Sequence, residues 1–371
     1  MKINIIGAGP AGLYFAILTK KAQPAHQITV YERNGPDDTF GWGVVFSGKT
    51  LSNLRSADEP SHHEITKYFA AWDNVDVVHR HAKISIHGNS FSGIARLQLL
   101  KILQQRAEQL GIEVLFNTDV TDIEALRESS DLLVAADGVN STVRQFYAEQ
   151  LQPILDVRPN RYIWYGTPQL FHGLTLTFRQ RSNGVFAAHS YKFNQQTSTF
   201  IVECDAETWT GASFETMDEH NTREFLEDVF VMDLGGQPLL TNKSRWINFL
   251  LVRNRHWFFE NVVLLGDALH TAHFSIGSGT KLAMEDSIEL ANRVAVTPKV
   301  NAALVDFELI RRPVIEDYQA AAYESMRWFE HARDFLSLSP LELALSVMTR
   351  SGRVTVDDLK RRDPAFITTL D

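Results

Sequence analysis

The stretch Lys2-Ile-Asn-Ile-Ile-Gly7-Ala-Gly9-Pro-Ala-Gly12 decides the fold of this chain. Its apolar run predicts a buried strand, and the Gly-x-Gly-x-x-Gly pattern that follows predicts a tight turn into a helix. Gly7 permits the turn, Gly9 lets the backbone approach a pyrophosphate, and Gly12 lets the helix pack closely on the strand. The N-terminus of that helix offers free N–H groups and a positive dipole end to phosphates. The stretch therefore predicts a dinucleotide-binding unit.

A second strand and an acidic residue follow at the distance that such a unit requires. The segment Ile28-Thr-Val-Tyr-Glu32 ends twenty residues after Gly12, which places Glu32 to accept hydrogen bonds from ribose hydroxyls. A glycine triplet alone also serves ordinary turns, so the flanking strands and Glu32 decide between the two interpretations. Together these features favour the dinucleotide site.

Composition excludes several classes of protein. The chain has 371 residues, which suggests two compact domains or one domain with a large insertion. Cys204 is the single cysteine, so disulfides within the chain and sites of several thiolates are excluded, and a reducing, cytoplasmic location is expected. A net charge of −9 argues against nucleic acid as a partner. No apolar run approaches the roughly 18 residues of a membrane helix, so no membrane partner is expected.

The chain divides into regions of different sequence character. Residues 132–135 and 262–265 are wholly apolar and predict strands of a parallel sheet, and apolar residues at helical spacing predict a helix over 96–111. Residues 158–252 carry β-branched and aromatic runs joined by polar turns, which predict an antiparallel sheet. The predicted fold class is α/β, with a discontinuous Rossmann-like domain (1–75, 96–157 and 253–300), an inserted antiparallel β-sheet domain (76–95 and 158–252) and a C-terminal helical region (301–371).

Two aspartates follow predicted parallel strands, at the edge where open α/β sheets bind ligands. Asp137-Gly138 is followed by Arg144, and Gly266-Asp267 is followed by His270 and His273. A carboxylate at this edge can bind a chain of hydroxyl groups, such as the ribityl chain of a flavin. A strand-end Asp-Gly is also an ordinary turn, so each motif taken alone leaves both interpretations open.

A second glycine-rich turn follows in Phe274-Ser-Ile-Gly277-Ser-Gly279-Thr-Lys281 and leads into a predicted helix. The N–H groups and dipole of that helix would stabilise negative charge on a ring system lying against it. A reduced flavin carries such charge. An ordinary helix cap is the alternative, but three motifs in this order favour a flavin site, with Gly277 and Gly279 as the main catalytic contribution.

These motifs resemble the three signatures of the group A flavoprotein aromatic monooxygenases, over nearly the whole chain. The resemblance implies a p-hydroxybenzoate-hydroxylase-like fold and FAD as cofactor. It implies that Glu32 binds the adenosine ribose, that Asp137-Gly138 serves both FAD and NAD(P)H, and that Asp267 contacts the ribityl chain. The predicted cofactor-binding residues are Gly7, Gly9, Ala11, Gly12, Glu32, Arg33, Arg96, Asp137, Gly138, Asp267, Gly277 and Gly279.

A closer resemblance points to one branch of that family. His273-Phe274 and Lys281 replace the Pro-Pro and Asn found in many members, but they match the branch that holds salicylyl-CoA 5-hydroxylase and anthraniloyl-CoA monooxygenase. The stretches Gly41-Trp-Gly-Val-Val-Phe-Ser47 and Ser198-Thr-Phe-Ile-Val-Glu203 also resemble this branch. The violacein-pathway tryptophan 5-hydroxylase is similar in some of these stretches.

The resemblance implies a hydroxylase that consumes NADH or NADPH and O2 and acts through a flavin C4a-hydroperoxide. Its expected substrate is an ortho-hydroxy or ortho-amino aryl-CoA thioester such as salicylyl-CoA, and the protein is expected to be a monomer or homodimer. Two alternatives stay open at this point. One is a hydroxylase of a free aromatic or indole substrate such as tryptophan, and the other is a flavin-bound sensor without turnover.

Several polar and aromatic residues have two interpretations each. His189 and Tyr191 alternate onto one face of a predicted strand, so both belong either to the sheet core or to a catalytic pocket. His270 and His273 lack a third ligand at matching spacing, so structural or flavin-adjacent roles are favoured and no metal is expected. The cations from Arg350 to Arg362 favour a solvated tail, the alternative being a grip on CoA phosphates.

Overall fold

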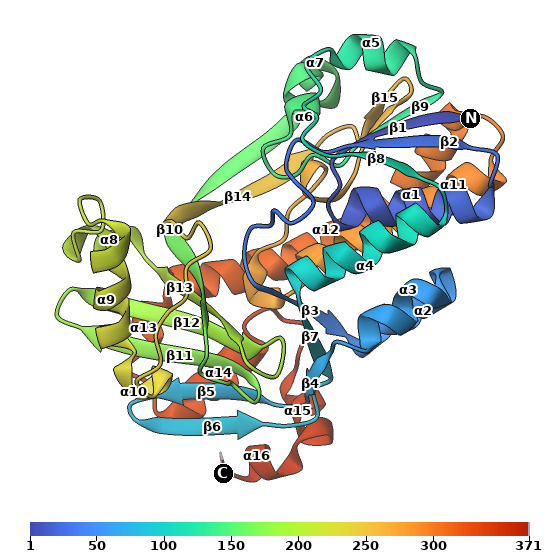
Figure 1. The fold of residues 1–371 in the computed structure, drawn as a ribbon. Coiled ribbons are helices and arrows are strands. Elements are labelled where there is room, and N and C mark those ends of the chain that lie inside the picture. Colours follow the sequence, from blue (N-terminus) through green and yellow to red (C-terminus); the bar gives the residue numbers. More distant parts are fainter. Residues whose placement is uncertain (370–371) are drawn as a thin grey trace.

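The computed structural model describes residues 1–369, and the chain begins in a six-stranded sheet of order β15-β16-β9-β1-β2-β8 (Figure 1). β1 lies parallel to both neighbours, with Ile5 opposite Val30 of β2 and Val134 of β9. These strands are almost wholly buried, as expected for a sheet covered on both faces. The strand bounds are Lys2–Ile6 (β1), Gln27–Tyr31 (β2), Glu113–Leu115 (β8), Leu132–Ala135 (β9), Phe258–Phe259 (β15) and Val262–Leu264 (β16).

Long helices cover one face of this sheet. α1 (Pro10–Ala22) packs against α4 (Arg96–Gln109) and α11 (Gly279–Val296), and their apolar side chains share one core with the strands. The helix predicted over 96–111 is confirmed, with its end two residues earlier. Three short helices lie at the top of Figure 1, namely α5 (Ile123–Glu128), α6 (Thr142–Phe146) and α7 (Ala148–Leu151).

A seven-stranded sheet of order β14-β10-β13-β12-β11-β5-β6 forms the second layer. β10 is long and pairs antiparallel with β13, with Tyr162 opposite Glu203. The pairing is antiparallel throughout except between β5 and β11, which run parallel. The bounds are Val75–His79 (β5), Ala82–Ile86 (β6), Pro153–Thr167 (β10), Leu174–Arg181 (β11), Gly184–Lys192 (β12), Ser198–Cys204 (β13) and Ile247–Asn254 (β14).

The two faces of this second sheet have different partners. One face packs on α8 (Ala206–Gly211), α9 (Glu219–Val229) and α10 (Val231–Leu234) through a cluster that includes Phe186 and Phe200. The other face meets the C-terminal helices through a cluster that includes Phe178 and Phe329. These helices are α12 (Val300–Glu330), α13 (Ala332–Phe335), α14 (Pro340–Thr349), α15 (Val356–Arg362) and α16 (Pro364–Thr368).

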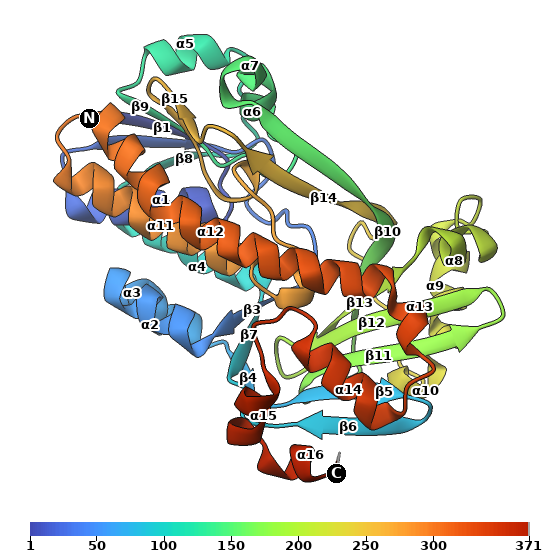
Figure 2. The ribbon, with the colours of Figure 1, turned by 180° about the vertical axis from the view of Figure 1, so that it is seen from behind.

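The 31-residue helix α12 joins the two sheets. Figure 2 shows it crossing the molecule from the first sheet to the second. Phe307 near its start lies in the core of the first sheet, and Trp328 and Phe329 near its end lie in the core of the second. Burying both ends of one helix in two cores fixes how the two sheets are placed.

A small third sheet, of order β3-β7-β4, lies beside the second. It consists of β3 (Gly43–Ser47), β4 (Ala70–Trp72) and β7 (Phe91–Ala95), and α2 (Gly48–Ala57) and α3 (Glu59–Thr66) connect β3 to β4. β3 and β4 lie in the predicted Rossmann-like domain, and β7 lies in the predicted β-sheet domain. The boundaries of these two domains stay a prediction.

Candidate active site

The first glycine turn lies between β1 and α1 and has no room for side chains at two positions. Gly7 has a φ of +105°, and a Cβ there would lie 2.2 Å from the carbonyl oxygen of Ala136. A Cβ on Gly12 would lie 2.1 Å from the carbonyl oxygen of Gly7. Gly9, in contrast, faces open space with no protein atom within 4 Å of a Cβ. The turn is thus closed against the protein and open on one side.

The N-terminus of α1 points into that open side without a capping side chain from residues 1–369. Its first turn contains Ala11, and the helix therefore presents backbone N–H groups and its positive dipole end. Glu32, at the end of β2, accepts from the backbone N–H groups of Ala8 and Asn34, both at 2.9 Å. Arg33 beside it is exposed. Glu32 is therefore fixed at the entrance of the turn.

Asp137, after β9, has one oxygen engaged and one free. Its Oδ2 accepts from the backbone N–H groups of Thr142 (2.7 Å) and Val143 (3.2 Å). Its Oδ1 is buried without a hydrogen-bond partner among the described residues, and Gly138 has a φ of +83° with open space beside it. Buried carboxylate oxygens normally have partners. A ligand hydroxyl or amide would supply the missing one.

Arg144 ties two of the predicted motifs together. Its buried guanidinium donates to the carbonyl oxygen of Val139 (2.5 Å), next to Gly138, and to that of Ala268 (2.9 Å), next to Asp267. The Asp137-Gly138 loop and the Gly266-Asp267 loop are therefore held as one unit. The sequence motif contained Arg144, but this role was visible only once the loops were placed in space.

Asp267 and Arg96 form the charged part of the site. Removal from bulk water raises the pKa of Asp267, although Arg96 and His270 oppose the shift. The Nε of Arg96, at the start of α4, is buried without a hydrogen-bond partner in the described part of the chain. The pair offers an unsatisfied donor and an acceptor at the carboxyl edge of the parallel strands, where the sequence predicted cofactor contacts.

The second glycine turn has the expected open form. Gly277 has a φ of +61°, and neither Gly277 nor Gly279 has a protein atom within 4 Å of a Cβ. α11 begins at Gly279 with no capping side chain from residues 1–369, so its N–H groups are free for a ligand. The sequence predicted a helix near 281–294, and the structure extends it by two residues at each end.

His270 contacts α11 through a buried carboxylate of that helix. Its Nε2 lies 2.6 Å from Asp286 of α11, and Arg311 of α12 donates to the same carboxylate at 2.8 Å. All three side chains are buried. His270 thus links α11 to α12 through Asp286, which is consistent with a structural role, and its role stays a prediction. The described residues hold no group of three or more His, Cys, Asp or Glu arranged to bind a metal.

These features fit FAD. Two helix N-termini, of α1 and α11, face the carboxyl edge of the sheet without side-chain caps. Glycines at 9, 138, 277 and 279 leave space where any side chain would intrude. Asp137 and Arg96 keep unsatisfied buried polar atoms. A dinucleotide with a pyrophosphate, hydroxyl groups and a planar ring that gains negative charge satisfies each of these in turn.

The second sheet turns one face toward this site, and we call it the inner face. Strand pairing places Tyr162 opposite Glu203 and His189 opposite Ile201, and directly opposed residues share a face. The rings of Tyr162 and His189 lie 4.7 Å and 5.2 Å from that of Phe274, at the second glycine turn. The residues of the inner face are Tyr162, Trp164, Gly166, Ala187, His189, Tyr191, Thr199, Ile201 and Glu203.

His189 and Tyr191 do share this face, and both are buried. Tyr191 donates its hydroxyl hydrogen to the carbonyl oxygen of Gly43 at 2.8 Å and stacks on Trp72. His189 lies with its Nε2 3.2 Å from a carboxylate oxygen of Glu203. Tyr191 thus fixes the Gly41–Gly43 segment to the sheet, and His189 belongs to a buried polar network.

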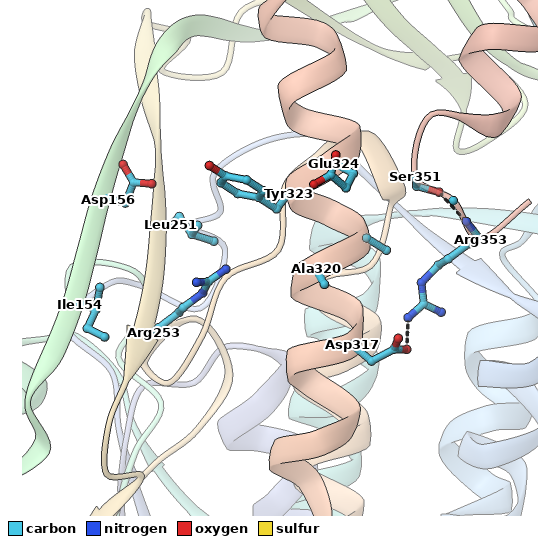
Figure 3. Close-up of a pocket in the computed structure, with 12 residues that line it drawn as sticks. Ile154, Asp156, Leu251, Arg253, Asp317, Ala320, Tyr323, Glu324, Ser351 and Arg353 are labelled. Atoms are coloured by element: carbon cyan, nitrogen blue, oxygen red, sulfur yellow. Dashed lines mark hydrogen bonds and ion pairs between the residues drawn. The ribbon is translucent and has the colours of Figure 1, made fainter.

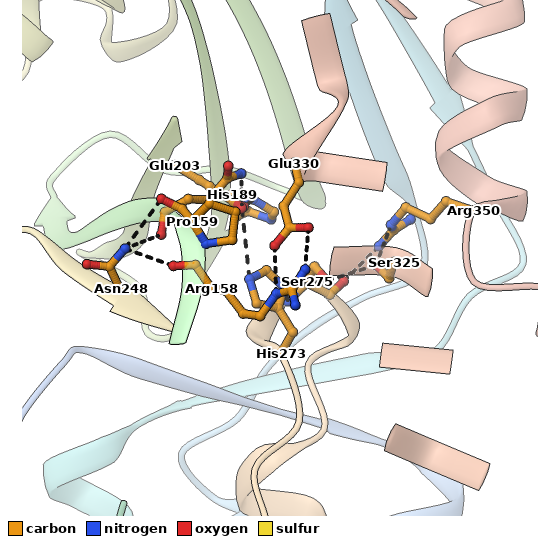
Figure 4. A network of polar contacts seen from close by, with 11 residues as sticks. Arg158, Pro159, His189, Glu203, Asn248, His273, Ser275, Ser325, Glu330 and Arg350 are labelled. Carbon is orange, nitrogen blue, oxygen red and sulfur yellow. Dashed lines mark hydrogen bonds and ion pairs between the residues drawn. The ribbon is translucent and has the colours of Figure 1, made fainter. Parts of the chain in front are cut away.

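Glu203 is the centre of that network (Figure 4). Asn160 donates to it at 2.8 Å, and the Nε2 of His273 lies 3.9 Å away. Burial alone would raise the pKa of Glu203, but the hydrogen bond from His189 and the nearby His273 hold it below its ordinary value. Burial lowers the pKa of His273 to about 4, so its imidazole is neutral around pH 7. No motif in the sequence pointed to Glu203; its only signal was an acidic residue in a strand that is otherwise uncharged.

The network continues to Arg350, which corrects an expectation. The favoured interpretation placed Arg350 in a solvated tail, yet it is bonded inside the protein, donating to Ser325 Oγ (2.9 Å) and to the carbonyl oxygen of Ser275 (2.7 Å). Burial lowers its pKa to about 10, against the opposing carboxylate of Glu203. The segment after α14 folds back against α12, which a local sequence pattern does not reveal. Arg350 therefore braces the second glycine turn.

The outer surface carries a separate groove of about 630 Å³, between β10, β14 and α12 (Figure 3). Asp156, Arg253 and Tyr323 line it, and Arg353 pairs with Asp317 at its edge. A second hollow of about 540 Å³ lies beside α2 and the ends of α1 and α11. Neither is lined by a residue predicted to bind FAD or to act in catalysis. Among residues 1–369, no helix is both long and apolar enough to cross a membrane.

Comparison with known proteins agrees with this geometry. The family model described as "FAD binding domain" matches residues 1–319. The chain is 40% identical to a salicyloyl-CoA 5-hydroxylase of a Streptomyces species, over the whole of this chain and 73% of that protein. It is 35% identical to the 3-hydroxy-4-methyl-anthranilyl-[aryl-carrier protein] 5-monooxygenase of Streptosporangium sibiricum, over 97% of both chains. It is also 35% identical to the protodeoxyviolaceinate monooxygenase of Chromobacterium violaceum, over 94% of both.

Solved structures share the fold. A tetrameric form of 2-methyl-3-hydroxypyridine-5-carboxylic acid oxygenase superposes with a TM-score of 0.73 and 20% identity, covering 97% of both chains. PqsL of P. aeruginosa, in complex with 2-aminobenzoylacetate, superposes with a TM-score of 0.71 and 18% identity, covering 91% of this chain and 98% of PqsL. The predicted fold class is confirmed.

Proposed function

The chain belongs to the family of this FAD binding domain and is a flavoprotein monooxygenase that hydroxylates aromatic rings, and from this premise we propose that its substrate is an ortho-hydroxy or ortho-amino aryl-CoA thioester such as salicylyl-CoA. NADH or NADPH is the proposed reductant and O2 the source of the added oxygen. The likeness to named hydroxylases and monooxygenases also favours an enzyme over a flavin-bound sensor.

The observation that carries the substrate proposal is the likeness along the whole chain to two proteins named for carrier-bound aromatic acyl groups. One is named for salicyloyl-CoA and the other for an anthranilyl group on an aryl-carrier protein. The chain shares 40% of aligned residues with the first of these proteins and 35% with the second. An aromatic acyl group with an ortho hydroxyl or amino substituent is common to both names.

The residues proposed to hold FAD are those with open space or unpaired polar atoms that fit parts of this cofactor. The α1 N-terminus at Gly9 to Gly12, including Ala11, would bind the pyrophosphate, with Glu32 and Arg33 toward the adenosine ribose. Arg96, Asp137 and Asp267 would bind the rest of the chain of hydroxyl groups. Bound FAD supplies the hydride acceptance and oxygen activation that side chains cannot.

The chain's own part in catalysis is to stabilise charge, orient the substrate and exclude water. The free N–H groups of α11, presented at Gly277 and Gly279, would stabilise negative charge on a ring lying against them. The inner face, with His189 and Tyr191, would orient the aromatic ring against the same turn. The buried aromatic side chains around it would keep water out, which strengthens the electrostatic effects. No acid–base pair is needed at the ring carbon itself.

A second candidate is a hydroxylase of a free aromatic or indole substrate such as tryptophan. The observation that favours it is the 35% identity to protodeoxyviolaceinate monooxygenase over nearly the whole chain. Both candidates use the same cofactor site, so the difference lies on the inner face and at its rim.

The experiment that decides is a screen of NADH and NADPH oxidation by the FAD-loaded protein. Salicylyl-CoA, anthraniloyl-CoA, free salicylate and tryptophan are compared, and the products are analysed by mass spectrometry for one added oxygen. Stimulation by the thioesters with hydroxylated product supports the proposal. Stimulation by salicylate or tryptophan alone favours the second candidate. Oxidation that no aromatic compound changes contradicts both.

A further inference from the structure

Three tryptophans gather at one end of the inner face, where the Gly41–Gly43 segment lies on the sheet. A Cβ on Gly41 would lie 2.7 Å from the ring of Trp164, and a Cβ on Gly166 would lie 2.7 Å from the ring of Trp42. The ring of Trp72 stacks on Tyr191 with centroids 5.8 Å apart. Gly41 and Gly166 are therefore needed to let the indoles of Trp164 and Trp42 pack this closely on the backbone, and Trp72 lies at the same sheet through Tyr191.

The three indoles have N–H groups without partners. The Nε1–H groups of Trp42, Trp72 and Trp164 are all buried and donate to no hydrogen-bond acceptor among residues 1–369. Trp72 is only 7% exposed. Leaving a buried N–H group unpaired is unfavourable, so such groups normally have a partner. Indole N–H is a neutral donor that pairs with a carbonyl oxygen.

Two further indoles without partners, Trp209 and Trp246, pack with the helices of the opposite face. Unpaired indoles are therefore not confined to the inner face. What distinguishes Trp42, Trp72 and Trp164 is their place: Trp164 belongs to the inner face, Trp42 lies against Gly166 of that face, and Trp72 stacks on Tyr191 of that face. The other two serve as matched controls.

Glu203 carries the one carboxylate among the nine residues that define the inner face, and none of the nine carries an ammonium or guanidinium group. Two arginines, Arg158 of β10 and Arg350 at the end of α14, belong to the same polar network. Trp164 lies two residues after Tyr162 on β10, on the same face, which places it about 7 Å along the strand from the Tyr162–Glu203 pair. The unpaired donors and the carboxylate thus lie within reach of one aromatic ring.

The cations nearest to Glu203 are already engaged. Arg350 donates to Ser325, to Ser275 and to the carbonyl oxygen of Val347. Arg158 donates to both oxygens of Glu330 and to Asp156 at 2.8–2.9 Å. A ligand carboxylate placed against the inner face would therefore meet a carboxylate and lack a free cation, and such burial is strongly unfavourable.

We propose that the inner face selects an aromatic substrate whose acyl group is uncharged: the carbonyl oxygen of a thioester, ester or amide accepts from the indole N–H groups, and Glu203 rejects a free ring carboxylate. The proposal rests on the proposed function and gives it a physical cause. A salicylyl or anthraniloyl group enters as a thioester because the thioester removes the charge, apart from any contact that the carrier makes.

The test uses small ligands that differ only in this charge. Salicylamide and methyl salicylate keep the ring and the ortho hydroxyl, whereas salicylate carries the carboxylate. Dissociation constants are measured by tryptophan fluorescence on the FAD-free protein and by the visible flavin spectrum on the FAD-loaded protein. We expect the neutral ligands to bind at least about a hundredfold more tightly than salicylate. Equal binding of salicylate and salicylamide overturns the proposal.

Two variants locate the effect. Glu203→Gln removes the charge at nearly constant shape. It should lower the ratio of the dissociation constant of salicylate to that of salicylamide at least about tenfold. Trp164→Phe removes one donor and should weaken salicylamide several-fold, whereas Trp246→Phe on the opposite face should leave it unchanged. An unchanged ligand ratio in Glu203→Gln, measured on folded protein, contradicts the role of Glu203. If that variant does not fold, the ligand series on the unaltered protein still decides.

The ligand series also separates this proposal from the proposed function. If salicylate binds as tightly as salicylamide and salicylyl-CoA is still hydroxylated, the selection by charge is contradicted and the proposed function stands. Failure of every aromatic ligand to bind, with no aromatic-stimulated NADH or NADPH oxidation, ends both.

Discussion

The carboxylate of Glu203 on β13 stands directly opposite Tyr162 on β10, at the point where the second sheet faces the second glycine turn. Burial, together with the charges of Asp267 and Glu203, raises the pKa of the Tyr162 phenol well above its ordinary value. Tyr162 therefore stays protonated and joins the cofactor side of the site to the substrate side. The two residues come from strands about forty positions apart, yet they define one boundary of the active site.

Gly9 and Gly12 should respond differently to the same substitution. Gly12→Val places a side chain against the carbonyl oxygen of Gly7 and should lower the free energy of unfolding of the FAD-free protein by about 3 kcal/mol or more. Gly9→Val places it in open space, so stability should change by less than about 1 kcal/mol while FAD affinity falls at least about tenfold. Urea unfolding and FAD titration check both. Normal FAD binding by Gly9→Val would contradict the pyrophosphate site.

Gly279 can be tested against a matched glycine. Gly279 and Gly48 are each the first residue of a helix, α11 and α2, and neither would meet a protein atom closer than 3.4 Å. Gly279→Val should leave the FAD-free protein folded but slow reduction of the flavin by NADH or NADPH about tenfold or more, because the N–H groups of α11 would be shielded. Gly48→Val should leave reduction unchanged. Stopped-flow reduction at 450 nm, roughly the flavin absorbance maximum, measures both; equal rates would remove the charge-stabilising role.

Asp286 should contribute more to stability than other acidic residues of α11. Asp286→Asn leaves the buried Arg311 and His270 without their charged partner, so the free energy of unfolding should fall by about 3–5 kcal/mol. Glu289→Gln removes a more exposed pair with Arg293 on the same helix and should cost less than about 1 kcal/mol. Urea unfolding of the two variants gives the comparison, and equal losses would show that burial of the Asp286 network is unimportant.

His273 should make the protein less stable in mild acid. Its folded pKa of about 4 lies below the unfolded value of 6.5, so the unfolded chain binds more protons between these two values and stability falls as pH is lowered through them. The full effect is of order 3 kcal/mol. His273→Asn should flatten the dependence of unfolding free energy on pH over this range, whereas His220→Asn, at an exposed position, should not. An unaltered slope in His273→Asn would contradict the buried neutral state.

Much of the cofactor site was predictable because it depends on local backbone geometry. The two glycine turns and the strand-end aspartates are short stretches whose function follows from which residues can adopt the turn and where the strand ends. The helix over 96–111 and the paired strands of the second layer followed from periodicity. The end of the helix shifted by two residues, and β10 begins at Pro153, five residues before the predicted region 158–252.

The inner face was not predictable in the same way. Glu203 and Tyr162 lie on separate strands, and nothing in the linear pattern says that they are opposed. Arg350 looked like part of a charged tail because its neighbours are charged and Gly352 follows it. Its burial depends on how the segment after α14 folds back onto α12, which is a property of the whole chain.

The amino-acid sequence by itself determined the two glycine turns, the α/β class and the family, because glycine stereochemistry, strand ends and helix starts act within about ten residues. The tertiary structure alone decided which charges are buried together, namely Glu203 with His189 and His273, and Asp286 with Arg311. Such groupings depend on strand register and helix packing between distant segments, and the free energy of a buried charge is set by neighbours that no local pattern names.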